Sequence, residues 1–197
     1  MQVGVLALQG GFEPHARAFA RLGCAVELVR RPEQLATLTH LTLPGGESTT
    51  LHHLLELFGL REVLIERHRA GRLALFGTCA GAILLGRAAV APPPRMELLD
   101  IELERNAYGR QAESFTAAVE IAELGAPAFE CVFIRAPKIR AVGRDVQVLA
   151  QLGVDPILVA QRGSLAATFH PELTDDVRLH ALFLARASSL RASALQA

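Results

Sequence analysis

An apolar strand that runs directly into a glycine-flanked cysteine constrains this chain more than any other feature. Residues 73–76 are Leu-Ala-Leu-Phe, and Gly77-Thr-Cys79-Ala-Gly81 follows, before an apolar helical pattern. A nucleophile on such a sharp strand-to-helix turn has a strained backbone, so its neighbours must be small. The turn places the Cys79 sulfur at a helix N-terminus, where the helix dipole favours the thiolate. The pentapeptide therefore indicates a nucleophile, with an ordinary buried cysteine as the alternative.

Strand patterns alternate with helical patterns along the N-terminal half of the chain. We expect strands at Val3–Leu8, Ala25–Val29, Leu41–Leu43 and Leu73–Phe76, and helices at Glu13–Leu22, Thr49–Phe58 and Arg61–Ala70. Such alternation with short turns indicates a parallel sheet that helices cover on both faces. Sites in these sheets lie beyond the carboxyl ends of the strands, where Gly10, Gly45, Gly46 and Cys79 all fall.

The second half of the chain has short strand patterns with few helices between them. They lie at Leu98–Glu104, Phe115–Ile121, Glu130–Ile134, Val146–Gln151, Ile157–Gln161 and Leu165–Phe169. We expect antiparallel additions to the sheet here, and a final helix from about Asp175 to Ala187. Because no repeat and no long linker interrupts the chain, we expect a single domain over residues 1–188 and a frayed tail over residues 189–197.

Composition narrows the class of protein. The chain has 197 residues, 51% of them hydrophobic, and a formal net charge of zero. That length is enough for a core on both faces of a sheet. The sequence shows no stripe of basic residues, so nucleic-acid binding has no electrostatic basis. No apolar run approaches the roughly 20 residues of a membrane span, and no secretory signal is evident, so we expect a cytoplasmic protein. The spacing of Cys24, Cys79 and Cys131 argues against a disulfide framework and a zinc site.

A second motif supplies the partners that a cysteine nucleophile needs. Residues 164–172 read Ser-Leu-Ala-Ala-Thr-Phe-His-Pro-Glu. Strand residues two apart point to the same side, so His170 and Glu172 can face one site, while Pro171 indicates that the segment is leaving the sheet. A nucleophile requires a base, and the base requires an orienting group. Taken singly, a core histidine is the better explanation of His170, and a helix-start acid is the better explanation of Glu172.

A third motif, Pro44-Gly45-Gly46-Glu47-Ser48, joins a strand to a helix. Two glycines let backbone N–H groups approach a ligand closely, which suits an oxyanion site. The alternative is an ordinary turn that ends in a helix N-cap.

In this order, the Pro-Gly-Gly-Glu-Ser, Gly-Thr-Cys-Ala-Gly and Phe-His-Pro-Glu motifs resemble the class I, or triad, glutamine amidotransferases. More narrowly, the chain is similar to the family of glutaminase subunits of pyridoxal 5′-phosphate synthases, over roughly residues 2–188. This narrower resemblance rests on five segments, at residues 5–10, 31–35, 104–111, 133–137 and 170–174. The Arg-Asn-x-x-Gly-Arg-Gln and Phe-Ile-Arg-Ala-Pro motifs are the specific ones.

The resemblance implies a fold, a reaction and a set of site residues. The fold is a three-layer α/β/α sandwich of the flavodoxin-like class I glutamine amidotransferase type, with a mixed, mostly parallel sheet. The reaction is hydrolysis of L-glutamine to glutamate and ammonia, without a cofactor or metal. The catalytic residues would be Cys79, His170 and Glu172, and the backbone N–H groups of Gly46 and Ala80 are candidates for the oxyanion hole. Glutamine-binding residues would be Gly46, Glu47, Ser48, Arg105, Ile134 and Arg135.

The planar guanidinium of Arg105 suits a carboxylate, although a surface ion pair explains Arg105 and Arg135 equally well. The resemblance also implies a partner, a synthase subunit in a large hetero-oligomer that uses the ammonia to make vitamin B6. Two alternatives stay open at this point. One is the glutaminase of another synthase, such as the imidazole glycerol phosphate enzyme, and the two specific motifs argue against it. The other is a DJ-1-like chaperone or redox protein, which would not need the His-Pro-Glu or Pro-Gly-Gly-Glu-Ser motif.

Overall fold

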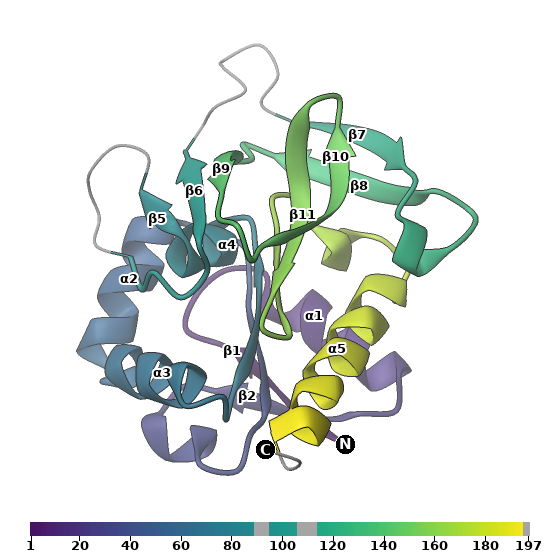
Figure 1. The fold of residues 1–197 in the computed structure, drawn as a ribbon. Helices are drawn as coiled ribbons and strands as arrows, with labels where there is room; N and C mark the ends of the chain where they lie inside the picture. Colours follow the sequence, from purple (N-terminus) through teal and green to yellow (C-terminus); the bar gives the residue numbers. More distant parts are fainter. Residues whose placement is uncertain (89–94, 106–113, 195–197) are drawn as a thin grey trace.

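A computed structural model describes residues 1–88, 95–105 and 114–194 and places a seven-stranded sheet at its centre (Figure 1). The strand order is β10-β11-β12-β4-β3-β1-β2. The five strands from β12 to β2 are mutually parallel, whereas β11 and β10 are antiparallel additions at one edge. The bounds are β1 Gln2–Leu6, β2 Ala25–Val29, β3 His40–Leu43, β4 Ala74–Thr78, β10 Gln147–Leu152, β11 Asp155–Gln161 and β12 Ser164–Ala167. The expected mixed, mostly parallel sheet is confirmed.

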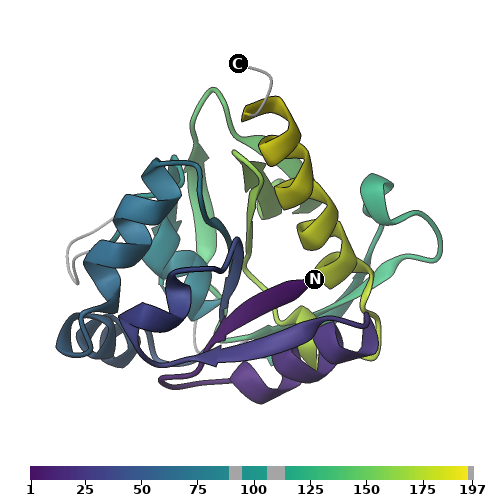
Figure 2. The ribbon, with the colours of Figure 1, turned by 90° about the horizontal axis from the view of Figure 1, so that it is seen from below.

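Helices lie on both faces of this sheet, which makes three layers (Figures 1 and 2). Helices α2 (Ser48–Leu57), α3 (Leu60–Arg69) and α4 (Ala80–Leu85) share one core cluster, and α1 (Phe12–Arg21) and α5 (Arg178–Ala194) share the other. Successive residues of β4 feed opposite faces, because Leu75 joins the first cluster and Phe76 the second. This period-two pattern is why a two-faced sheet reads as a continuous apolar run in the sequence.

Two smaller sheets lie beside the central one. A three-stranded sheet contains β5 (Arg87–Ala88), β6 (Ile101–Glu104) and β9 (Lys138–Val142). An antiparallel pair contains β7 (Ser114–Val119) and β8 (Phe129–Ile134). The sequence patterns therefore located β6, β7 and β8 but wrongly implied that they extend the main sheet. Strand β9 was not expected, because Lys138 and Arg140 hide its apolar alternation.

Helix α5 begins later and ends later than its apolar pattern predicts. Asp176 sets its start, since the carboxylate accepts the backbone N–H of Arg178 at 2.9 Å. The helix continues to Ala194, beyond the expected end at Ala187 and into the expected tail. Within the described residues, no helix is both long and apolar enough to cross a membrane.

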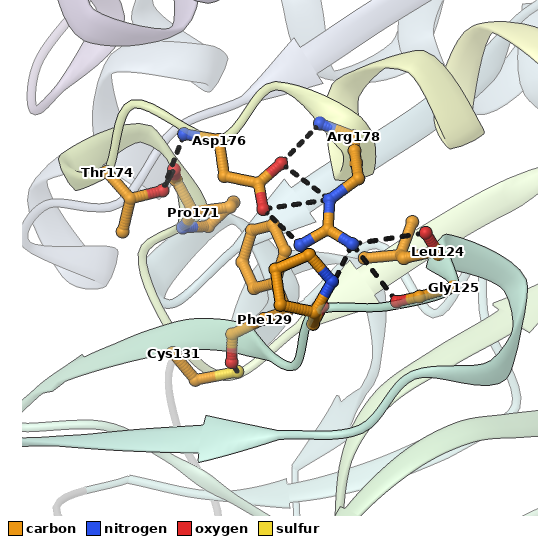
Figure 3. Close-up of polar contacts among 9 residues, drawn as sticks. Leu124, Gly125, Phe129, Cys131, Pro171, Thr174, Asp176 and Arg178 are labelled. Atoms are coloured by element: carbon orange, nitrogen blue, oxygen red, sulfur yellow. Dashed lines mark hydrogen bonds and ion pairs between the residues drawn. The ribbon is translucent and has the colours of Figure 1, made fainter.

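Arg178 fastens the start of α5 to the β7–β8 pair (Figure 3). Its Nη1 atom donates to the carbonyl oxygens of Leu124, Gly125 and Pro127 at 2.9–3.1 Å, and its other nitrogens bind Asp176. The short 3₁₀ helix η2 (Ala122–Leu124) carries the first of these carbonyls. The contact joins two elements that adjoin the candidate site, because β8 ends at Ile134 and α5 comes shortly after the His-Pro-Glu motif.

Candidate active site

The turn between β4 and α4 has the strained geometry that its glycines predict. Cys79 has φ 48° and ψ −104°, a left-handed region that side chains rarely adopt. A Cβ atom on Gly81 would lie 2.0 Å from the carbonyl oxygen of Leu43, and one on Gly77 would lie 2.7 Å from the nitrogen of Ala82. Neither position tolerates a side chain. The backbone N–H of Cys79 donates to Ala167 at 2.9 Å, which ties the turn to β12.

His170 and Glu172 form a close pair beside this turn. His170 Nδ1 lies 2.7 Å from Glu172 Oε1, and both side chains are buried. The backbone N–H of His170 donates to the carbonyl of Val132 in β8 at 2.8 Å, which fixes the start of the 3₁₀ helix η3 (Pro171–Leu173). Thr174 Oγ1 closes that turn by donating to the carbonyl of Pro171 at 3.1 Å (Figure 3). The segment therefore leaves the sheet at the expected residue.

The charges around His170 favour its cationic form. Burial lowers the pKa of His170, but its interactions with Cys79 and Glu172 outweigh burial and raise the pKa to about 10. Burial likewise raises the pKa of Glu172, yet the imidazoles of His15 and His170 hold it below its usual range. His170 Nε2 has no hydrogen bond of normal geometry within the described residues, so this nitrogen is available to a reacting group. Such a pair has the geometry of a base and a carboxylate that orients it.

Gly45 brings the third motif against the other two. A Cβ atom on Gly45 would lie 2.4 Å from His170 Cε1 and 3.4 Å from Cys79 Cβ, so the glycine backbone contacts both residues. The Gly45 carbonyl accepts the N–H of Gly11 at 3.0 Å. Because a trans peptide directs its C=O and N–H to opposite sides, the N–H of Gly46 points away from Gly11. Within the described residues, neither Gly46 N–H nor Ala80 N–H has a hydrogen-bond partner.

A cavity of about 350 Å³ opens over Cys79 and His170. Every residue expected to bind glutamine lines it, and Glu172 lies behind His170, outside the lining. The lining residues are Gln9, Gly46, Glu47, Ser48, Cys79, Ala80, Ile83, Arg105, Ile134, Arg135 and His170. The Cys79 Sγ atom lies 3.9 Å from the carbonyl oxygen of Ile134. The remainder of the Arg-Asn-x-x-Gly-Arg-Gln motif, residues 106–111, lies outside the described residues.

Two lining residues were not expected as site residues. Gln9 follows β1, and its Oε1 accepts the backbone N–H of Glu47 at 3.1 Å. This hydrogen bond stabilises the Gly45-Gly46 turn. Its signal in the sequence was its place after a strand, next to Gly10. Ile83 faces the cavity from α4, one turn after Cys79, and only the helix geometry brings it there.

This fold, with a cysteine on its central strand-to-helix turn and a histidine–carboxylate pair at the next strand, is that of the class I glutamine amidotransferases. The profile of the SNO glutamine amidotransferase family matches residues 5–189, and the chain belongs to that family. Both the class and the narrower family expected from the motifs are confirmed, and the DJ-1-like alternative is wrong.

Relatives and solved structures agree with this assignment. "Pyridoxal 5′-phosphate synthase subunit PdxT" of Thermus thermophilus is 52% identical, over 92% of this chain and 95% of the relative. The protein of the same name from Thermotoga maritima is 48% identical, over 93% of this chain and 98% of the relative. A crystal structure of a glutamine amidotransferase superposes with a TM-score of 0.90 at 50% identity, covering 94% of this chain and 98% of that one. A GMP synthase protein from Thermoplasma acidophilum (17% identity, TM-score 0.68, covering 97% and 96%) shares the fold.

Proposed function

We propose that this chain is the glutaminase subunit of a pyridoxal 5′-phosphate synthase. The observation that carries the proposal is the position of His170, which faces the Cys79 cavity with one side of its ring and binds Glu172 with the other. The family and the names of the relatives supply the substrate, L-glutamine, and the partner, a synthase subunit.

In the first half of the proposed reaction, Cys79 is acylated. The Cys79 thiolate attacks the side-chain amide carbon of glutamine, and the carbonyl electrons move to the oxygen. The N–H groups of Gly46 and Ala80 would stabilise that oxyanion, and one such donor is typically worth ~3 kcal/mol. Protonated His170 then gives its proton to the leaving nitrogen, so that ammonia departs and a thioester remains.

In the second half, water replaces the thioester. Neutral His170 takes a proton from the attacking water, the tetrahedral intermediate collapses, and glutamate leaves with the Cys79 thiolate restored. Glu172 stabilises the imidazolium each time it forms and holds the ring in one tautomer. Arg105 lines the cavity and would bind the α-carboxylate of glutamine, since its planar fork matches a carboxylate.

The ammonia would pass to the synthase subunit inside a hetero-oligomer. The size of that complex, its cytoplasmic location and the absence of nucleic-acid and membrane partners stay predictions. Co-purification of the native complex, followed by cell fractionation, tests them together.

The direct test replaces Cys79 with alanine. We expect Cys79→Ala to abolish ammonia release from glutamine in the presence of the synthase subunit, while added ammonium still supports pyridoxal phosphate formation. Cys24→Ala is the matched control, because Cys24 is half-buried and lies outside the cavity lining. Glutamine-dependent activity that survives in Cys79→Ala would overturn the proposal.

A further inference from the structure

Two fully buried histidines lie directly behind Glu172, and the reaction above does not use them. His15 comes from α1 and His180 from α5, and both have no exposed surface. His15 Nδ1 lies 2.9 Å from His180 Nε2, so the two imidazoles are hydrogen-bonded to each other. Burying polar rings costs free energy unless their nitrogens are hydrogen-bonded, so the partners of these four ring nitrogens decide which tautomers are stable.

The second nitrogen of His15 faces the catalytic carboxylate. His15 Nε2 lies 3.1 Å from Thr78 Oγ1 and 3.3 Å from Glu172 Oε2. The Glu172 side chain is 1% exposed, and its other oxygen, Oε1, binds His170. Within the described residues, Oε2 makes no hydrogen bond of normal geometry, so the contact between His15 Nε2 and Oε2 is a close electrostatic approach and the hydrogen bond of His15 Nε2 goes to Thr78. Each carboxylate oxygen of Glu172 is thus paired with one imidazole, His170 on the cavity side and His15 on the core side.

The surroundings settle where the protons of this pair lie. Burial lowers the pKa of His15 and that of His180, so both rings are neutral and each carries one N–H at neutral pH. If that N–H of His15 were on Nδ1, the Nε2 lone pair would accept the Thr78 hydroxyl and would lie 3.3 Å from an oxygen of the anionic Glu172 carboxylate. His180 would then hold its N–H on Nδ1, which is buried and has no partner within the described residues.

The opposite arrangement avoids both penalties. His180 donates from Nε2 to Nδ1 of His15, and His15 donates its Nε2–H to Thr78 Oγ1, with Glu172 Oε2 at 3.3 Å from the same nitrogen. The buried atom left over is then an acceptor on His180, enclosed by the rings of Phe19 and Phe76 at centroid distances of 5.0 and 5.9 Å. An unpaired acceptor nitrogen costs less here than an unpaired donor together with a lone pair facing a carboxylate.

We infer that His15, oriented by His180, is a positioning residue whose N–H, donated to Thr78, lies beside Glu172 Oε2 and thereby keeps the carboxylate that binds His170 ionised. The inference rests on the proposed function and deepens it, because it adds two residues to the machinery that sets the base. Neither histidine contacts the cavity, so they act only through Glu172.

In the part of the chain that the structure describes, few other charged groups lie near Glu172. A depression of about 270 Å³ beside it is lined by Arg17, Arg21 and Asp175 along with apolar residues and Thr174. Arg21 and Asp175 are solvent-exposed and paired with each other at 3.2 Å, so solvent screens their effect on Glu172. His15 and His170 are the groups that face the carboxylate directly.

The first test uses the wild-type chain and needs no substitution. Nitrogen-15 NMR of histidine-labelled protein distinguishes the two neutral tautomers of an imidazole. We expect both His15 and His180 to carry the proton on Nε2 and to stay neutral from pH 6 to 8. A His15 tautomer protonated on Nδ1, or a cationic His15, would overturn the inference, whatever the protein proves to catalyse.

The second test compares two substitutions at one position. His15→Leu removes the N–H, whereas the amide of His15→Gln can restore a donor at the place of Nε2. With the synthase subunit present, we expect His15→Leu to lower kcat by roughly 10-fold and His15→Gln to recover most of it. The pH range over which kcat stays high should also narrow in His15→Leu, because Glu172 then becomes protonated at a higher pH and His170 loses its proton at a lower pH.

A matched control separates positioning from packing. His68 in α3 is also buried and donates to a carbonyl, that of Leu73 at 3.0 Å, but it does not line the cavity. His68→Gln should keep the wild-type pH profile even if the protein is less stable. An unchanged pH profile in folded His15→Leu would overturn the inference. The proposed function would still stand in that case, provided that the wild-type protein shows glutaminase activity. Absent wild-type activity would instead contradict the proposed function.

Discussion

The Arg105 guanidinium lies 3.1 Å from the Glu47 carboxylate at the wall of the cavity over Cys79. A second nitrogen of Arg105 donates to Thr49 Oγ1 at 3.1 Å, so the guanidinium already has two partners in the free subunit. The Glu47 carboxylate has partners of its own, since it accepts the backbone N–H groups of Thr49 and Thr50 at the start of α2. A substrate carboxylate at Arg105 must therefore compete with Glu47, or join it by sharing the guanidinium fork.

Arg105→Ala should weaken glutamine binding more than it slows the reaction. Hydrogen bonds to charged groups are worth ~1.5–3 kcal/mol each, so we expect KM to rise at least ~10-fold. The change in kcat should be smaller, because Arg105 does not touch the reacting amide in the proposed geometry. Steady-state kinetics with the synthase subunit present measure both constants. An unchanged KM would show that Arg105 forms only a surface ion pair. Arg105→Lys, which keeps the charge, tests whether the planar guanidinium is needed.

Glu47→Ala should destabilise the fold at neutral pH by about 1 kcal/mol, the usual contribution of an N-cap. Burial raises the pKa of Glu47, but the hydrogen bonds from Thr49 and Thr50 outweigh it and hold the pKa at about 2. A depressed pKa adds stability above the unfolded value, and that stability is lost as the pH falls. The difference between wild type and variant should therefore shrink from about pH 4.5 toward pH 2. Urea unfolding across that range measures it, with the exposed Glu120→Ala as the control.

Glu172→Gln should be milder than His170→Ala, because it changes the orientation and charge around the base rather than removing it. We expect its loss of kcat to be at least ~10-fold smaller. Glu172 also helps to raise the pKa of His170, so the alkaline limb of the kcat profile should move to lower pH. We expect the two residues to act as one unit. If the double variant lost the product of the two single factors, that shared role would be contradicted.

An electrophilic glutamine analogue should label Cys79 and spare the other two cysteines. Burial raises the pKa of the Cys131 thiol to about 12, so this residue is a neutral thiol at neutral pH and is enclosed in the core. Cys24 is half-buried, outside the cavity lining. Peptide mapping by mass spectrometry locates the adduct, and excess glutamine should protect against it. An adduct on Cys24 or Cys131 would contradict the assignment of the nucleophile.

The residues that sequence patterns located share one property, which is that their signal is local. The strained Cys79 turn requires glycine at Gly77 and Gly81, and the His170-Pro171-Glu172 segment combines alternation with a strand-ending proline. Both can be recognised within a few residues of chain. The same holds for the parallel strands, whose apolar runs end at glycine turns.

The residues that sequence patterns missed depend on tertiary packing. His15 and His180 are separated by 165 positions and look like isolated polar residues on two apolar helix faces. Only the packing of α1 against α5 brings them together behind Glu172. Similarly, β9 forms a strand because it pairs with β6. Its two basic residues interrupt the apolar alternation, so the sequence pattern alone does not reveal this strand.

The free subunit should be a poor glutaminase that is activated when the synthase partner docks. The Gly45 carbonyl is held by the N–H of Gly11, and a Cβ atom on Gly10 would lie 1.9 Å from that carbonyl oxygen. The turn after β1 is therefore in direct contact with the turn that carries Gly46, and we expect a shift of one to move the other. Gly10 is exposed, so a docking partner can reach it and redirect the Gly46 N–H toward the oxyanion.

Activation of ~100-fold requires only ~2.7 kcal/mol, which is about one oxyanion donor. The measurement is kcat for glutamine hydrolysis by the purified chain, first without and then with saturating synthase subunit. Gly10→Ala should lose the activation, because its φ of 92° and the close carbonyl both exclude a side chain. Gly153→Ala is the matched control, with φ 61° but no neighbouring atom within 4 Å. Equal kcat values with and without the partner would show that the site is already formed, and the coupling between the two glycine turns would then have no role in control.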